Sequence, residues 1–135
     1  MVWIIYALIF LSLASPQDFA VIKNVPIVQA QLAPEYCAYI TWWGTEEAVI
    51  EVDLSQLCPI NQHQLSDYEH IIWWSCLLAH ESGHLASQVG EHPPLGYAYE
   101  RHYKCFDTFI AAGWGTSKIT TWRDEVYMRY VEGTP

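Results

Sequence analysis

Two histidines and a glutamate are the residues of this sequence best suited to chemistry. His80, Glu81 and His84 stand as His-Glu-Ser-Gly-His within an apolar stretch. On a helix, residues four apart share one face and lie about 6 Å apart along the axis. Two imidazoles placed in this way can bind one Zn²⁺, which lowers the pKa of a bound water to about 7. The spacing therefore predicts a zinc site at which Glu81 acts as general base towards that water.

A catalytic zinc ion needs a third protein ligand and an open coordination position. We expect His92 as that ligand, because a turn at Gly90 can fold it back towards the end of the helix. His102 is the alternative among the histidines. Glu100 or Glu125 is the alternative if the third ligand is a carboxylate.

The helix that carries the motif has a clear beginning in the sequence. Ser66 and Glu69 have the spacing of a capping box, in which each side chain bonds the backbone N–H of the other residue. An apolar stretch without Gly or Pro follows, and Gly90 provides a stop. These signals predict a helix from about Asp67 to about Val89.

Strands are expected before this helix, and a further helix after it. Composition predicts an irregular or edge strand over residues 19–33, a hairpin over 36–54 and a loop over 59–64. A tyrosine-rich loop is expected over 93–105, and Thr116 or Ser117 can cap a last helix. The strand Ala48–Leu54 could offer its edge to an extended peptide, although an ordinary paired strand fits its pattern equally well.

Three tyrosines follow His92 in the expected loop. The hydroxyl of Tyr97, Tyr99 or Tyr103 could stabilise a developing oxyanion, and packing at the rim of the site is the alternative role for each.

Four cysteines, at positions 37, 58, 76 and 105, are consistent with two disulfides if the chain is exported. Cys76 lies eight residues, or about 12 Å, before His84 on the predicted helix. That separation removes it from the zinc site. Cys76 is therefore expected to anchor the helix through a disulfide, with Cys105 as one possible partner.

The first residues indicate export. Residues 2–14 are apolar except for Ser12, and Ser12-Leu13-Ala14 fits a signal-peptidase site. Thirteen helical residues span about 20 Å, which is too short for a hydrocarbon core of about 30 Å. We therefore expect a signal peptide over residues 1–15 and a secreted or extracytoplasmic protein without a stable membrane span. A membrane-tethering segment or a buried N-terminal strand is the alternative.

Length and charge restrict the remaining possibilities. The 135 residues suffice for one domain, and 52% of them are hydrophobic. The net charge of −9, with no cluster of Lys or Arg, argues against a nucleic-acid partner. The oligomeric state is not specified by these features.

The segment from Leu78 to His92 resembles the active-site helix of the zincin metallopeptidases, and of their metzincin branch in particular. The resemblance includes a glycine and a third histidine after the motif. His92 comes two residues later than in the usual HExxHxxGxxH pattern, and Met128 lies in a predicted helix instead of a tight turn. The chain would therefore be a divergent and minimal relative.

The resemblance implies His80, His84 and His92 as zinc ligands and Glu81 as the base. It implies an α+β fold over residues 16–135, with a small twisted mixed sheet packed on a long active-site helix, and a C-terminal helix completes the expected domain. The implied activity is hydrolysis of a peptide or protein substrate. Two alternatives are a non-catalytic exported binding module with a structural or vestigial zinc site, and a zinc hydrolase of another amide.

Overall fold

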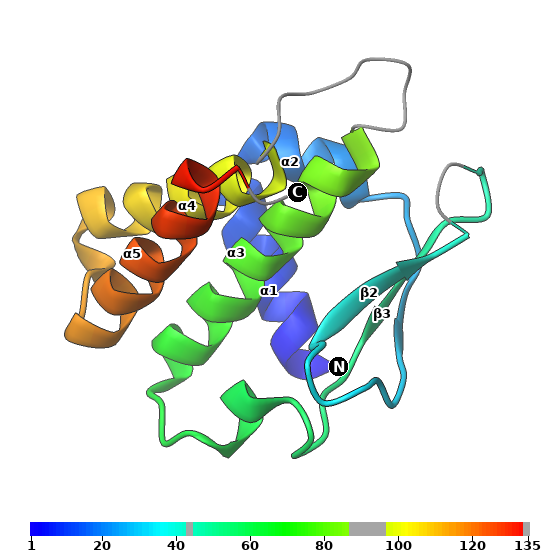
Figure 1. Ribbon diagram of the computed structural model, residues 1–135, viewed down its shortest axis with the longest axis horizontal. Coiled ribbons are helices and arrows are strands. Elements are labelled where there is room, and N and C mark those ends of the chain that lie inside the picture. The colour runs from blue at the N-terminus through cyan, green and yellow to red at the C-terminus, as the bar shows by residue number, and fades with distance from the viewer. Residues whose placement is uncertain (43–44, 87–96, 134–135) are drawn as a thin grey trace.

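Helix α3, Asp67–Ala86, runs through the middle of the structure and carries the histidine motif (Figure 1). The computed structural model describes residues 1–42, 45–86 and 97–133. Helices α1, α2 and α4 and strand β2 all pack against α3. A small mixed sheet lies on one side of α3, and α4 and α5 lie on the other (Figure 1). The expected α+β architecture is therefore confirmed.

The predicted capping box begins α3. The Ser66 backbone N–H donates to Glu69 Oε1 over 3.0 Å, and the Glu69 N–H donates to Ser66 Oγ over 3.1 Å. These reciprocal bonds satisfy backbone donors that the first helical turn leaves without partners. The predicted end of the helix, at residues 87–90, lies outside the described residues.

The sheet contains three strands in the order β1, β3, β2. Strand β2, Ala38–Thr41, pairs antiparallel with β3, Val49–Val52, so the predicted hairpin is confirmed. Strand β1, Ile27–Gln29, pairs in parallel with the other side of β3. Of the two alternatives for Ala48–Leu54, the ordinary paired strand is therefore correct, because β3 is paired on both sides. Among the described strands, β1 and β2 form the edges.

Helix α4, Tyr97–Phe109, replaces most of the predicted tyrosine-rich loop. Its buried residues recur at helical spacing: Ala98, His102, Cys105, Phe106 and Phe109. Packing of this face against α3 outweighs the modest helix propensity of the aromatic residues. The loop prediction was therefore wrong from residue 97 onward.

Two disulfides connect the elements. Cys76 of α3 bonds Cys105 of α4, with the two Cα atoms 5.4 Å apart, as the sequence suggested. Cys37 bonds Cys58, with the Cα atoms 5.1 Å apart, and joins the start of β2 to the segment before α3. Structural disulfides of this kind indicate an oxidising environment.

The N-terminal residues form two helices, α1 over Val2–Ala14 and α2 over Pro16–Ile22. Ile4, Ala7 and Leu11 of α1 are buried, and Ser75 Oγ of α3 donates to the Ala7 carbonyl over 3.0 Å. None of the helices in the described ranges combines the length and apolar character needed to cross a membrane. Cleavage of residues 1–15 as a signal peptide stays a prediction.

The segment 19–33 was predicted as an irregular or edge strand. The part up to Ile22 belongs instead to α2, where Pro16 occupies the first helical position that its fixed φ favours. Strand β1 confirms the rest of the prediction, since it forms an edge of the sheet.

The C-terminal part contains the predicted last helix, α5, Ser117–Val131. Thr116 is its N-cap and accepts a hydrogen bond from the Ile119 N–H over 3.3 Å. A short π-helical segment, η2, Ile110–Trp114, connects α4 to this cap. A 3₁₀ turn, η1, Pro59–Gln62, occupies the loop predicted before α3.

Candidate functional site

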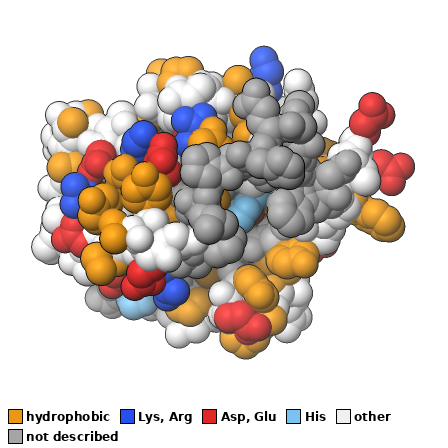
Figure 2. Space-filling model, turned by 45° about the horizontal axis from the view of Figure 1, so that its top comes forward, with side chains coloured by type: hydrophobic (Ala, Val, Ile, Leu, Met, Phe, Trp, Pro, Cys, Tyr) orange, Lys and Arg blue, Asp and Glu red, His pale blue; other side chains and the backbone are white. Residues whose placement is uncertain are grey.

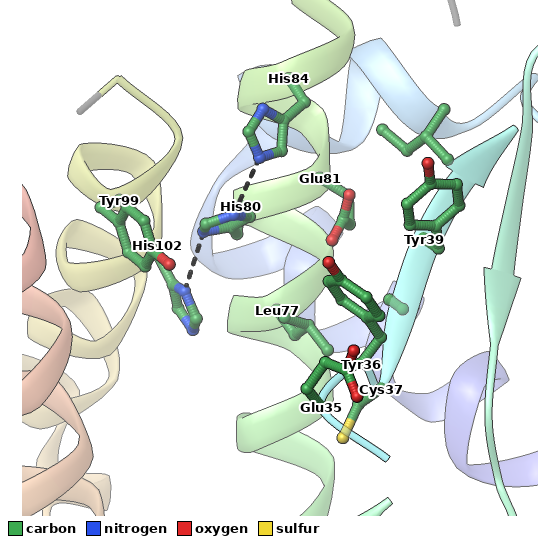
Figure 3. A pocket seen from close by; sticks show the side chains of 12 residues that line it. Glu35, Tyr36, Cys37, Tyr39, Leu77, His80, Glu81, His84, Tyr99 and His102 are labelled. Atoms are coloured by element: carbon green, nitrogen blue, oxygen red, sulfur yellow. Dashed lines mark hydrogen bonds between the residues drawn. The ribbon is translucent and has the colours of Figure 1, made fainter. Parts of the chain in front are cut away.

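Three histidine rings from two helices form a continuous row (Figure 3). The Nε2 atoms of His80 and His84, one turn apart on α3, are 3.0 Å apart. The other ring nitrogen of His80, Nδ1, lies 3.3 Å from Nδ1 of His102 on α4. His80 therefore stands between two other imidazoles and faces each with a different nitrogen.

The pair His80 and His84 fits the requirement of a zinc site. Two nitrogens that share a tetrahedral ion at about 2.0–2.1 Å lie about 3.4 Å apart. The observed 3.0 Å between the Nε2 atoms is close to that separation, and both atoms face the same space. Small rotations of the two rings would therefore admit an ion.

The predicted third ligand, His92, lies outside the described residues. Of the alternatives, Glu100 pairs with Lys104 Nζ over 3.0 Å, and Glu125 is exposed on α5. Within the described ranges, no group of three or more His, Cys, Asp or Glu side chains is arranged to hold one ion. The described residues thus bring together two candidate ligands, His80 and His84.

His102 is close to the pair but does not converge with it. It contacts His80 at Nδ1, whereas the two facing nitrogens of His80 and His84 are Nε2 atoms. A further ligand would have to offer a lone pair near the Nε2 atoms, and His102 instead faces Nδ1 of His80. In this arrangement His102 is therefore not itself a ligand but contacts one, His80.

Burial favours the neutral form of the three rings. It lowers the pKa of His102 to about 3 and lowers the pKa of His84 below its usual range. For His80, burial holds the pKa well below its usual range, and the neighbouring His102 and His84 lower it further. Neutral imidazole is the form that binds metal ions, because its lone pair is available.

Glu81 is buried on the side of α3 that faces the sheet (Figure 3). Burial raises the pKa of its carboxyl to about 7. A carboxyl with a pKa near neutrality can both accept and return a proton, which suits a general base. Glu81, one residue after His80, is thus oriented differently from the two histidines.

A cavity of about 460 Å³ lies between α3, α4 and β2 and brings these residues together. Figure 2 shows a histidine side chain in a hollow of the surface. The cavity is lined by the residues of the histidine row, by Glu81, Leu77 and Tyr99, and by residues 35–40, a continuous segment that leads into β2. The lining is mainly apolar, with a few polar groups, as is usual for ligand sites.

The tyrosines predicted near the site separate into two groups. Tyr99 lines the cavity, and its ring centroid lies 4.5 Å from that of His80. Tyr103 packs instead against Tyr127 of α5, and Tyr97 lies beneath Arg101.

The sequence reasoning missed Tyr36, which lines the cavity from the start of the hairpin. Its hydroxyl points towards Glu81 (Figure 3). The predicted hairpin over 36–54 contained this residue, but no local pattern indicated that its first strand would face the motif.

Helix α4 approaches α3 closely at Gly83, within the motif itself. A Cβ atom at this position would lie 2.7 Å from the Ala98 Cα atom, well inside normal contact distance. The two central residues of the motif, Ser82 and Gly83, are therefore not equivalent. Position 83 must be glycine for α4 to approach α3 this closely. The close approach brings His102 and Tyr99 against His80.

An ion pair fixes the outer side of α4. Arg101 Nε lies 2.8 Å from Oδ1 of Asp18 on α2, and the Asp18 side chain is buried. This contact, together with the Cys76–Cys105 disulfide, holds α4 at two further points.

Comparisons of the chain with protein-family models, with curated proteins and with solved structures found no match. The function of the chain is therefore inferred from the residues and geometry of the site.

Proposed function

We propose that the chain is a zinc-dependent peptidase, with His80 and His84 as two of the metal ligands. The observation that carries this proposal is the 3.0 Å approach of two neutral imidazole nitrogens at the wall of a cavity that also contains Glu81. His92 is retained as the proposed third ligand, because the sequence places it after the motif.

Zinc bound by these histidines would polarise a water molecule and the substrate carbonyl. Glu81 would take a proton from the attacking water at its carboxylate and return it to the leaving nitrogen. Its burial at the cavity supports this role, because burial favours proton uptake by the carboxylate. Tyr99, beside His80, limits the space around the reacting groups.

Strand β2 supports a peptide as the substrate. It is an edge strand, and residues 35–40, which include its first part, line the cavity. An edge strand can bind an extended peptide through backbone hydrogen bonds. Such binding would place a peptide bond between the sheet and α3, where Glu81 lies.

The two disulfides support a location outside the cytoplasm. Together with the apolar N-terminal segment, they lead us to propose that the protein is secreted or extracytoplasmic.

The test is peptide hydrolysis by Glu81→Gln, assayed with a library of internally quenched peptides. We expect kcat to fall by about 10²- to 10⁴-fold, because the amide cannot accept the proton. Zinc content should stay at the wild-type level, since Glu81 is not a ligand.

The matched control is Glu46→Gln, which removes an exposed carboxylate that does not line the cavity. Its kcat should remain within a few-fold of wild type. Equal hydrolysis by Glu81→Gln and the wild type would exclude Glu81 as the base.

A further inference from the structure

We infer that His102 is a positioning residue that holds His80 in its metal-binding tautomer by accepting a hydrogen bond from His80 Nδ1–H. The inference depends on the proposed zinc site. It assigns His102 a role different from the ligand role that the sequence left open. The contact that carries it is the 3.3 Å approach of the two Nδ1 atoms.

The number of protons on the two rings limits how they can bond. A neutral imidazole has one N–H donor and one nitrogen lone pair. The contact between the two Nδ1 atoms therefore requires one of them to donate and the other to accept. Either His80 is protonated on Nδ1, or His102 is.

Metal binding selects one of these arrangements. An ion between the two facing Nε2 atoms uses the Nε2 lone pair of His80, so the proton of His80 must be on Nδ1. His102 must then accept at Nδ1 and keep its own proton on Nε2. In the opposite arrangement, His80 would direct Nε2–H at His84 and could not bind the ion through that atom.

His102 is held firmly enough to make this selection. Its side chain is buried, and its ring stacks on Phe106 with the centroids 5.3 Å apart and the planes at 24°. Its Nε2 atom is buried without a hydrogen-bond partner among the described residues. The contact with His80 is therefore the polar contact that sets the tautomer of the His102 ring.

This arrangement matches the general behaviour of metal-binding histidines. Such residues usually donate their second ring N–H to an acceptor, which fixes the orientation of the ring and raises its basicity. A carboxylate or a carbonyl commonly fills that place, and here a neutral imidazole from the neighbouring helix does so.

Two substitutions of similar shape test the inference. In His102→Asn the amide oxygen can stand near the position of Nδ1 and accept the same hydrogen bond. In His102→Leu the side chain has a similar size but no hydrogen-bond acceptor. We expect the zinc Kd, measured by competition with a chromophoric chelator, to rise about 10- to 100-fold for Leu and to stay within about 3-fold for Asn.

The coordination itself gives a second readout, independent of hydrolysis. With Co²⁺ in place of zinc, the visible spectra of both variants should match the wild type, because the ligand set is unchanged. A changed spectrum in both variants would show that His102 is a ligand. Wild-type affinity in His102→Leu would show that the contact has no role. Either result overturns the inference.

The unsubstituted protein provides a check that does not depend on how a variant folds. NMR of the ring nitrogens in the zinc-loaded wild type should show His80 protonated on Nδ1 and His102 protonated on Nε2. A proton on His102 Nδ1 would contradict the inference while leaving the proposed zinc site intact. A wild type that binds no zinc would remove the proposed function, and the role of His102 with it.

Discussion

Gly83 is the residue that allows two helices to share one site. The Ala98 Cα atom occupies the space that a side chain at position 83 would need. In an isolated helix, replacing glycine with alanine is stabilising by about 1 kcal/mol. Gly83→Ala should nevertheless destabilise this protein by about 1–3 kcal/mol, because α4 must move away from α3. Urea denaturation measures the change.

Gly115→Ala is the matched control for this prediction. Gly115 has a φ of −67°, and an added Cβ would lie no closer than 3.4 Å to the nearest atom, in Ile110. Alanine should therefore be tolerated at Gly115 with little change in stability. Similar unfolding free energies for the two variants would show that the approach at Gly83 does not constrain the helices.

Individual residues of the site differed in how far the sequence could predict them. The four-residue spacing of His80 and His84 predicted their shared face, because helical geometry is local. The role proposed for His102 could not be predicted in this way, since it depends on the contact between α4 and α3. His92 stays a prediction, because it lies outside the described residues.

At the scale of elements, the Glu69 carboxylate joins the beginnings of two helices. Oε1 accepts from the Ser66 N–H at the start of α3, and Oε2 accepts from Thr116 Oγ, at the N-cap of α5, over 2.8 Å. The hydrogen bonds from the Ser66 backbone and from Thr116 lower the pKa of this carboxyl below its ordinary value of 4.5, against the effect of burial. The charged form is therefore the one that connects α3 and α5.

This connection predicts a pH dependence of stability. Because the folded-state pKa is below the unfolded value, the stabilisation is fully present above about pH 4.5 and is lost as the pH falls through the folded-state pKa. Glu69→Gln should lose about 1 kcal/mol at neutral pH, since its amide nitrogen cannot accept the Thr116 hydrogen bond. Denaturation between pH 3 and 7 should show the difference from wild type shrinking as the pH falls.

Glu125→Gln serves as the control, because Glu125 is an exposed carboxylate on α5. It should leave the stability curve close to that of the wild type. A Glu69→Gln deficit that remained constant down to pH 3 would contradict the proposed role of the charge.

Elements with local signals were predicted well, and those defined by packing were not. The capping box marked the start of α3, and Thr116 marked the start of α5. Helix α4 was missed because its tyrosines suggested a loop. The spacing of Ala98, His102 and Cys105 was a visible sign of a buried helical face.

For the molecule as a whole, α3 is the element on which the rest of the fold is assembled. Helix α1 covers one part of it, α4 is disulfide-bonded to it at Cys76, and β2 closes the cavity beside Glu81. The α+β class was expected from the family resemblance, and the separate strand and helix signals of the sequence agreed with it. The sequence could not predict which edge of the sheet is free, because that depends on the long-range pairing of β1 with β3.

The central claim, that His80 and His84 bind zinc together, is tested most directly by equilibrium dialysis of the purified, disulfide-bonded protein against buffered free zinc. We expect one zinc per chain in the wild type and in His63→Ala, which alters an exposed histidine outside the cavity. His84→Ala should bind zinc more weakly by at least about 100-fold. A wild type without bound zinc, or equal affinity in His84→Ala, would contradict the claim.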